Sequence, residues 1–520
     1  MATGVTARMP RQFVRWCAAA VAIVAAAAGA RRATAAPGTT AAGADAAAPD
    51  AAAPGTRAAG AAAAAPAAAA SRHDAGAPEN RSPRPGLAAR VDAIAAEVAR
   101  LRGLPLRRPL RRRTADAAAV RAYVARVVAR GGSAGDAAAE ARALARMGLL
   151  PDAQARAEAY VDALAREVVG FYDPWQQTLY VVDRDPSPAD AQIVVAHEVG
   201  HALQDQHFDL RAFIAGAGAH NGDAALARQA LVEGDGMAVT IEYAFAQVGA
   251  DPPWGDPSVV RRLAGAFAAA GGASRTGRLA DAPLAVRSPL SFPYTAGLAF
   301  VARYRTFHSW QRIDQMYRQP PLSTEHILHP ETYAAYERPD EVTVRPLRAL
   351  ADYRVTYRNV LGEFGFRVWL RQLGAPAYAA SAAADGWGGD RIALYEPAAG
   401  APGRPIVAVY SVWDDEIDAI ELVDALAGGL AAFAAEGARS AADRRIAAGQ
   451  HAHAAAASRG RDAGTGALAA DGVAAVRDAR GDVYLAARRG DAVVIVLGAP
   501  AGRATAIVDE MWRRWRVTRH

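Results

Sequence analysis

The segment HEVGH, residues 197–201, brings two imidazoles and a carboxylate into five positions. On a helix, His197 and His201 stand one turn apart with Cβ atoms about 5–6 Å from each other, so both can bind one zinc ion. Glu198 points about 100° away from His197 and can instead take a proton from a water molecule at the ion. Residues 193–196 are Ile-Val-Val-Ala, which predicts a buried helix. Buried histidines and glutamates need a metal or full hydrogen bonding, so the segment predicts a metal site.

Three residues compete to be the third ligand. His207 follows His201 by six positions, a spacing that serves a metal only if the chain turns at Gln204, where a residue other than glycine turns at a cost. Asp205 lies on roughly the face of His201, but a straight helix carries it a turn past the ion. Glu233 lies on a second predicted helix that could cross the first and aim its carboxylate at the metal, with one coordination position left open. We favour Glu233 and keep His207 and Asp205 as alternatives.

The elements that position these residues follow from the surrounding pattern. The run REVVGFYDPWQQTLYVVDRD has two β-rich stretches on either side of Asp173, which indicates a hairpin. Ser187 and Pro188 then provide an N-cap and a first helical residue for the helix that carries HEVGH. Gly200 inside that helix costs about 1 kcal/mol relative to alanine, which indicates a close backbone contact there. The second helix is expected at about 224–245.

This order of elements resembles the catalytic core of zincin metallopeptidases of the gluzincin type. More closely, the segments GFYDP, HEVGHALQDQHFDL, ALVEGD, FPYTAGLAFV and STEHILHPETY are similar to those of a group of exported bacterial zincin-like proteins. The resemblance extends from about Val91 to beyond GWGGDRIALY. It implies that His197, His201 and Glu233 bind zinc and that Glu198 is the general base.

The resemblance leaves two roles to assign. Many gluzincins carry an acid four residues after the ligand glutamate to orient a histidine, but that position here is Met237, and the nearby acid is Asp235. Peptide hydrolysis also needs a donor for the developing oxyanion. Tyr294, His326 and His329 are the candidates, and we expect Tyr294 and His329 to be catalytic.

Three further segments have competing interpretations. The strand expected at Thr178–Asp183 could form a sheet edge that receives an extended peptide. The segment GGSAG around Ser133 matches the pattern of a hydrolase nucleophile, but the helical pattern before it predicts a loop between helices. The histidine-containing run HAHAAAASRGRD, residues 451–462, is interpreted as a solvated loop in a low-complexity insert.

The N-terminal region has a composition of its own. Three arginines precede the apolar run WCAAAVAIVAAAAGA, and the small residues ATA follow it. We predict a signal peptide at residues 1–35, with an uncleaved membrane anchor as the alternative. A disordered Ala/Gly/Pro linker is expected at residues 36–84. The only cysteine, Cys17, lies in the apolar run, so the mature protein is expected to have no disulfide and no thiolate ligand.

The net charge does not identify a partner. The formal charge is +6, but the chain contains no lysine, and arginine is abundant throughout, which is a property of its overall composition. We therefore expect no nucleic-acid partner. The arginine-rich run RRPLRRR, Arg107–Arg113, is expected to be a solvated face.

The predicted fold class is α+β, in two domains. Residues 85–383 are expected to form a mostly helical zincin-like metallopeptidase domain with a short β-hairpin. Residues 384–520 are expected to form a smaller α+β domain with an antiparallel sheet, because strand-like runs such as AVVIVLGAP gather there.

The predicted function is an exported hydrolase, periplasmic or secreted, that uses one Zn²⁺ ion. A peptidase acting on a peptide or protein substrate is the first interpretation, and contact with the cell envelope is also considered. No transmembrane span is expected once the signal is removed, and the sequence indicates no oligomeric state. Two alternatives are a non-catalytic, zinc-stabilised envelope binding protein and a zinc amidase acting on cell-wall material.

Overall fold

A computed structural model describes residues 85–130, 134–150, 170–182, 188–263, 283–436, 471–478 and 480–520. The predicted signal peptide (1–35), the linker (36–84), the Ser133 loop, the Ser187 cap and the insert at 451–462 lie outside these residues. Within them, no helix combines the length and the apolar character needed to cross a lipid bilayer.

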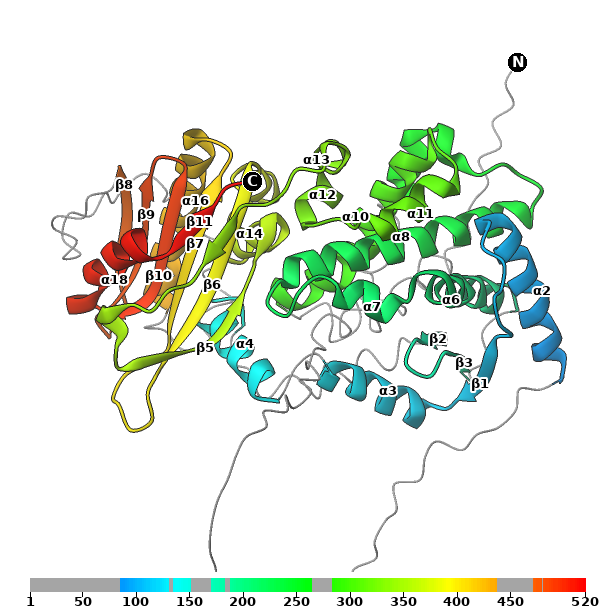
Figure 1. The fold of residues 1–520 in the computed structure, drawn as a ribbon, viewed down its shortest axis with the longest axis horizontal. Helices are drawn as coiled ribbons and strands as arrows, with labels where there is room; N and C mark the ends of the chain where they lie inside the picture. Colours follow the sequence, from blue (N-terminus) through cyan, green and yellow to red (C-terminus); the bar gives the residue numbers. More distant parts are fainter. Residues whose placement is uncertain are drawn as a thin grey trace, which may run out of the picture. The chain divides into compact units, whose positions relative to one another are not determined.

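The N-terminal half is built around one buried helix, α8 (Gly222–Ala246). All residues from Asp223 to Tyr243 are buried except Leu226, as expected of a helix that is surrounded on every side. It lies between α10 (Leu284–Arg305) and α6 (Pro188–Phe208), and α2 (Pro85–Arg102) packs against both α6 and α8 (Figure 1). Shorter elements complete this half: α3 (Ala117–Arg130), α7 (Leu210–Ala215), η1 (Pro253–Gly255), α11 (Trp310–Arg318), α12 (Thr324–Leu328) and α13 (Pro330–Ala335).

The predicted hairpin is confirmed, and its turn has a local cause. Strands β2 (Gly170–Asp173) and β3 (Thr178–Val182) pair antiparallel. The Asp173 carboxylate accepts hydrogen bonds from the amides of Trp175 and Gln176, and Gln177 takes a positive φ of 51°. Such side-chain bonds are how aspartate initiates turns.

The expectation that the β3 strand is a sheet edge is wrong. The order of this sheet is β1-β3-β2, because β1 (Arg111–Ala115) pairs parallel with the other side of β3. The β3 backbone is therefore occupied on both sides and cannot receive a peptide by strand addition. The arginine-rich sequence of β1 gives little local indication of a strand.

A six-stranded antiparallel sheet forms the C-terminal half, so the α+β fold class is confirmed. Its order is β5-β6-β7-β10-β9-β8. Alternate residues of β7 face two different cores: Val407 and Val409 lie on one side, and Ala408 and Tyr410 lie on the other. Burial on both faces explains why this strand reads as a continuous apolar run. The strands are β5 (Tyr353–Asn359), β6 (Trp387–Pro397), β7 (Ile406–Trp413), β8 (Gly472–Arg477), β9 (Asp482–Arg489) and β10 (Ala492–Pro500).

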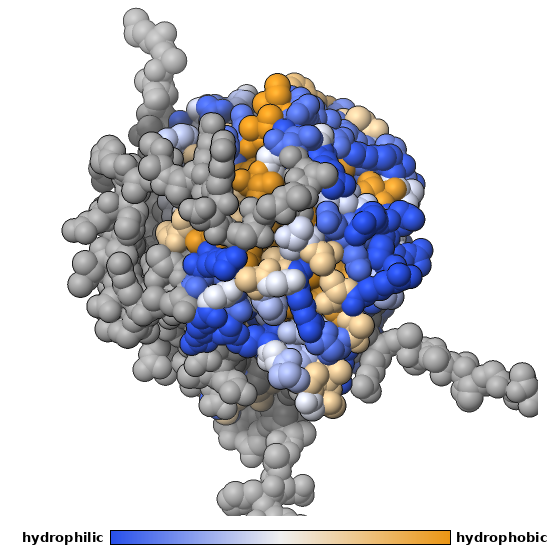
Figure 2. Space-filling model, turned by 90° about the vertical axis from the view of Figure 1, so that its left-hand side faces the viewer, coloured by the Kyte–Doolittle hydropathy of each residue, from blue (hydrophilic) through white to orange (hydrophobic). Residues whose placement is uncertain are grey.

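Helices cover both faces of this sheet. One core contains residues of α4 (Ala134–Arg146), α14 (Gly362–Gln372), α15 (Ala377–Ala382) and α16 (Glu416–Glu436), and the other contains α18 (Ala501–Arg514) and η2 (Arg348–Leu350). A two-stranded ladder joins β4 (Glu341–Thr343) to β11 (Arg516–Thr518). Among the residues that are coloured in Figure 2, hydrophilic side chains predominate, and hydrophobic side chains lie in small separate patches.

The large sheet begins before the domain boundary predicted at residues 383/384. Its edge strand β5 starts at Tyr353, and α4, from much earlier in the chain, packs on the same core as β5's neighbours. The sequence YRVTYRN of β5 alternates polar and apolar residues and was expected to belong to the helical region. All described residues belong to one unit by their contacts.

Candidate metal centre

Helices α6 and α8 bring His197, His201 and Glu233 together. The Nε2 atoms of the two histidines lie 3.0 Å apart, and each lies 3.3 Å from Oε2 of Glu233. Four ligands at about 2.0–2.1 Å from a tetrahedral zinc ion lie about 3.3 Å from one another, so the three atoms fit three corners of such a site. The side chains are almost fully buried, and that of Glu233 has no exposed surface. These residues can hold a metal ion.

Two close helix contacts make this convergence possible. An added Cβ at Gly236 would lie 3.1 Å from Cε1 of both imidazoles, so the two rings occupy the space that a side chain would fill. An added Cβ at Gly234 would lie 2.2 Å from the carbonyl oxygen of Gly297 on α10, where the two helix backbones meet. At Gly200, an added Cβ would lie 3.2 Å from the Val239 side chain and 3.8 Å from Cα of Gly236, so α6 packs closely on α8 there, with a side chain as the nearest neighbour. The glycines around Glu233 therefore set how closely α6 and α10 approach α8.

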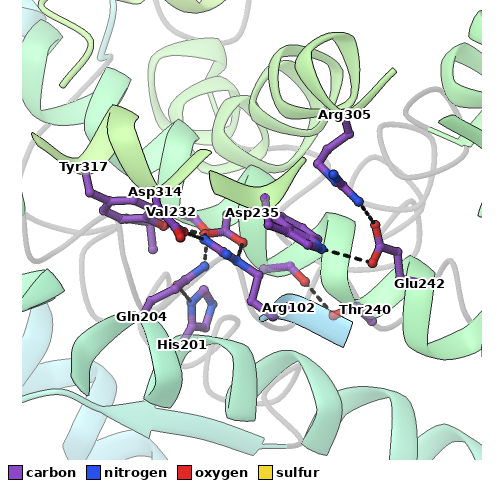
Figure 3. Close-up of polar contacts among 12 residues, drawn as sticks. Arg102, His201, Gln204, Val232, Asp235, Thr240, Glu242, Arg305, Asp314 and Tyr317 are labelled. Atoms are coloured by element: carbon purple, nitrogen blue, oxygen red, sulfur yellow. Dashed lines mark hydrogen bonds and ion pairs between the residues drawn. The ribbon is translucent and has the colours of Figure 1, made fainter. Parts of the chain in front are cut away.

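Gln204 fixes the tautomer of His201. Its amide nitrogen donates to the carbonyl oxygen of Val232 at 3.1 Å, and a carbonyl can only accept (Figure 3). The other end of the amide, Oε1, must therefore face His201, where it lies 2.9 Å from Nδ1. Nδ1 of His201 then carries the proton, and the lone pair of a neutral ring lies on Nε2, which faces Glu233.

Thr240 does the same for His197. Its hydroxyl donates to the carbonyl oxygen of Gly236 at 2.7 Å, and the same oxygen lies 3.4 Å from Nδ1 of His197. A hydroxyl whose proton is used in this way accepts from the ring, so the lone pair of His197 also lies on Nε2. The sequence analysis considered Met237 and Asp235 for the orienting role and missed both Gln204 and Thr240. Spacing is the signal that could have found them, because Gln204 lies three residues after His201 on α6 and Thr240 lies seven residues after Glu233 on α8.

Asp235 instead belongs to a buried ion-pair network that includes Arg102 of α2. The guanidinium of Arg102 donates to both carboxylate oxygens of Asp235, at 2.7 and 3.0 Å, and to Asp314 at 2.7 Å. The Tyr317 hydroxyl donates to the same Asp235 carboxylate (Figure 3). The Arg102 guanidinium also lies 4.4 Å from the ring centre of Trp310. Its carboxylate partners hold the pKa of Arg102 above its usual range although burial opposes this. The network ties α2 and α11 to α8 two residues after Glu233.

Glu198 is held from the hairpin side. Its Oε2 accepts a hydrogen bond from the amide of Tyr172 in β2 at 2.8 Å, whereas Oε1 has no hydrogen bond to any residue that the structure describes. Burial raises the pKa of the Glu198 carboxyl above its ordinary value. The Tyr172 hydroxyl donates in turn to Asp205, which also accepts from the amide of Leu210. Asp205 is thus a helix-end residue that supports the hairpin, and it is not a ligand.

The electrostatics of the three converging groups favour a positive charge among them. Burial alone raises the pKa of Glu233, but the imidazoles outweigh it and lower the pKa to about 2. Burial alone lowers the pKa of His201, but the Glu233 carboxylate raises it to about 9.

The other predicted histidines lie elsewhere. Helix α6 continues past Gln204 to Phe208, so His207 turns away and its Nε2 donates to the carbonyl oxygen of Pro105 at 2.7 Å. His326 is fully buried, and its Nε2 donates to the carbonyl oxygen of Glu337. Tyr294 of α10 is the one oxyanion candidate that contacts the site, with its ring centre 6.4 Å from that of His197.

His329 belongs to a second group that could hold a metal ion. Its Nε2 lies 3.0 Å from Glu363 and 3.2 Å from Asp385. The structure does not place His329 with the HEVGH residues, because its neighbours come from α14 and the segment after α15. The hydrogen bond that the His329 ring donates to the Glu363 carboxylate raises the pKa of His329. Arg367 already forms an ion pair with Glu363, so a cation would compete with that guanidinium.

The comparisons with known proteins bear only on the C-terminal half. A family described as a domain of unknown function (DUF8575) matches residues 353–480, from β5 to just beyond β8. The matched range contains none of the residues His197, His201 and Glu233. No curated protein and no solved structure matches the chain.

Proposed function

We propose that this chain is a zinc-dependent hydrolase, most simply a peptidase. The proposal rests above all on the convergence of three electron-donating atoms. The hydrogen bonds of Gln204 and Thr240 turn the lone pairs of both imidazoles toward the buried carboxylate of Glu233. Three lone pairs separated by 3.0–3.3 Å repel one another unless a positive charge, either a metal ion or a proton on an imidazole, lies among them.

The donor set supports zinc over other common cations. Two imidazoles and one carboxylate suit zinc, whereas magnesium and calcium prefer oxygen ligands alone. A site with three protein ligands also leaves a fourth position for a water molecule or substrate, as in catalytic zinc sites.

The neighbouring side chains supply the remaining chemistry. Zinc acts as a Lewis acid that polarises a carbonyl group and acidifies water. Glu198 is held by one oxygen and has its other oxygen available to take a proton from water and later to give it to a leaving amine. Tyr294 lies beside His197 and is our candidate donor to the developing oxyanion.

The substrate class and the location rest on sequence patterns. The resemblance of HEVGH and ALVEGD to gluzincin motifs favours a peptide or protein substrate, and the N-terminal pattern favours export to the periplasm or medium.

The test compares the parent protein with a Glu198→Gln variant, using purified full-length chain. Glutamine can still accept the Tyr172 amide bond, so zinc content and stability should be retained. It cannot take a proton, so turnover of casein or of a peptide library should fall by about 10²–10⁴-fold. Glu421→Gln, an exposed position on α16, is the matched control and should keep full activity. Tyr294→Phe should lower kcat and leave zinc content unchanged.

The possible outcomes separate the alternatives. Turnover that disappears with Glu198→Gln, while zinc remains, supports the peptidase proposal. Turnover of purified cell-wall material alone would replace it by an amidase. Zinc without turnover of any of these substrates would indicate a zinc-stabilised binding protein, and a parent that binds no zinc would overturn the proposal altogether.

A further inference from the structure

A cavity of about 650 Å³ opens beyond the C-terminal end of α6. Its walls come from the loop before β1, the β2–β3 turn, the α6–α7 junction and the end of α11. This volume is in the range of ligand-binding sites. Four arginines from three of these segments line it: Arg107, Arg108, Arg211 and Arg318.

The last turn of α6 holds the arginine loop in place. The buried Gln206 accepts hydrogen bonds from the amides of Arg107 and Arg108, at 2.8 and 3.1 Å, and donates to the Arg108 carbonyl oxygen at 3.2 Å. His207 donates to the carbonyl oxygen of Pro105 in the same loop. Four bonds from two consecutive side chains fix this backbone, so the two arginines are held at the cavity before any ligand arrives.

The carboxylates around the cavity already have partners. Asp314 forms an ion pair with the buried Arg102, Asp209 caps the amide of Ala212, and Asp205 accepts from Tyr172 and Leu210. Among the residues that the structure describes, Arg107, Arg211 and Arg318 form no ion pair, and Arg108 reaches Asp205 only at 3.7 Å.

Helix ends account for only part of this positive charge. Arg107 donates to the carbonyl oxygen of Gln206 near the end of α6, and Arg318 lies in the last turn of α11, where cations are favoured. Neither Arg108 nor Arg211 lies at the C-terminal end of a helix, so helix ends do not account for their charges. Among the described residues, Arg211 has only a cation–π contact with Trp175, 5.9 Å from the ring centre, so none of them occupies its donors.

We propose that this cavity binds an anionic ligand that carries at least two carboxylate or phosphate groups. Guanidinium groups pair with both kinds of oxyanion in a bidentate manner, and four of them exceed what one small anion needs. The stacked rings of Phe208 and Tyr317, 4.0 Å apart, form an apolar part of the wall next to these charges. This site is separate from the zinc proposal, since none of His197, His201 and Glu233 lines the cavity.

The test is calorimetric titration of the full-length protein with two probes. Inorganic pyrophosphate represents the phosphate source, and a tetraglutamate peptide represents the carboxylate source. At least one probe should bind, and Arg211→Gln and Arg318→Gln should each weaken that binding by about tenfold or more. Arg513→Gln removes the same charge from an exposed position on α18 and should leave the affinity unchanged.

Each outcome has a distinct meaning. Tighter binding of pyrophosphate or of the peptide identifies which source the cavity prefers. Binding that is absent from the parent, or that falls equally in all three variants, would overturn the proposal. Zinc content measured in the same samples should not change on binding of the probe. A protein that binds the probe but contains no zinc would refute the proposed hydrolase and leave the anion site intact.

Discussion

Replacement of Gln204 by leucine should loosen the metal centre without touching a ligand. The side chain makes two buried hydrogen bonds, to Nδ1 of His201 at 2.9 Å and to the Val232 carbonyl oxygen at 3.1 Å. Leucine is similar in size but leaves both partners without a hydrogen bond. Each buried polar group left in this way costs about 1–3 kcal/mol, and loss of an outer partner of a ligand histidine lowers metal affinity by about 10–100-fold.

Gln204→Glu separates the effect on zinc affinity from the effect on stability. A carboxylate still accepts from Nδ1 of His201, so zinc affinity should stay near that of the parent. It cannot donate to Val232, and two oxygens then face each other, so the zinc-free protein should lose about as much stability as Gln204→Leu. Gln315→Leu, at an exposed position on α11, should change neither property.

Two measurements decide this prediction. Competition with a chromophoric chelator gives the zinc affinity, and urea unfolding of the zinc-free protein gives the free energy of unfolding. A Gln204→Leu protein that is less stable but binds zinc as tightly as the parent would refute the argument that Gln204 orients His201.

Three further predictions follow from other buried contacts. Gly236→Ala should lower zinc affinity by about tenfold or more in equilibrium dialysis, since its Cβ would lie 3.1 Å from Cε1 of both imidazoles. Gly502→Ala, where an added Cβ meets nothing within 4 Å, should leave zinc affinity unchanged. Arg102→Leu should reduce the free energy of unfolding by about 3–5 kcal/mol because it isolates the buried Asp235, and a negligible loss in urea unfolding would contradict this. Burial raises the pKa of Asp223 to about 8, so its protonated form stabilises the fold, and this contribution is lost as pH rises from about 4 to about 8. Asp223→Asn should flatten that part of the pH dependence of unfolding, and unchanged slopes would count against it.

Much of the helical framework follows from local sequence. The helix that begins at Pro188 starts where the sequence places a proline at the first helical position, and the hairpin around Asp173 follows from side-chain hydrogen bonds within its turn. The buried strands of the large sheet are apolar on both faces, which made them recognisable. Strand β1 was missed because its residues are largely polar, and it pairs with β3 from a distant part of the chain. Strand β5 has the alternating pattern of a half-buried strand, but it was assigned to the helical region that surrounds it in the sequence.

Some residues of the candidate site can also be recognised in the sequence, whereas others become visible only in the fold. HEVGH and Glu233 could be found because ligand types and helical spacing are visible in the sequence. Arg102 could not, because it reads as an ordinary basic residue in the last turn of a helix. Only the fold brings it to Asp235, 133 positions later, and buries it there. His329 was expected to be a catalytic donor because its segment carries the family resemblance, but in the fold its Nε2 faces Glu363 of α14.

The central claim is that one zinc ion is bound by His197, His201 and Glu233. The most direct measurement is zinc stoichiometry with X-ray absorption at the zinc edge, on the full-length parent and on Glu233→Gln, Glu233→Ala and His207→Ala proteins shown by circular dichroism to be folded. We predict about one zinc per parent chain with a nitrogen and oxygen shell at about 2.0–2.1 Å, weakened or lost in both Glu233 variants and retained in His207→Ala. A parent without zinc after reconstitution, or zinc lost only in His207→Ala, would contradict the account.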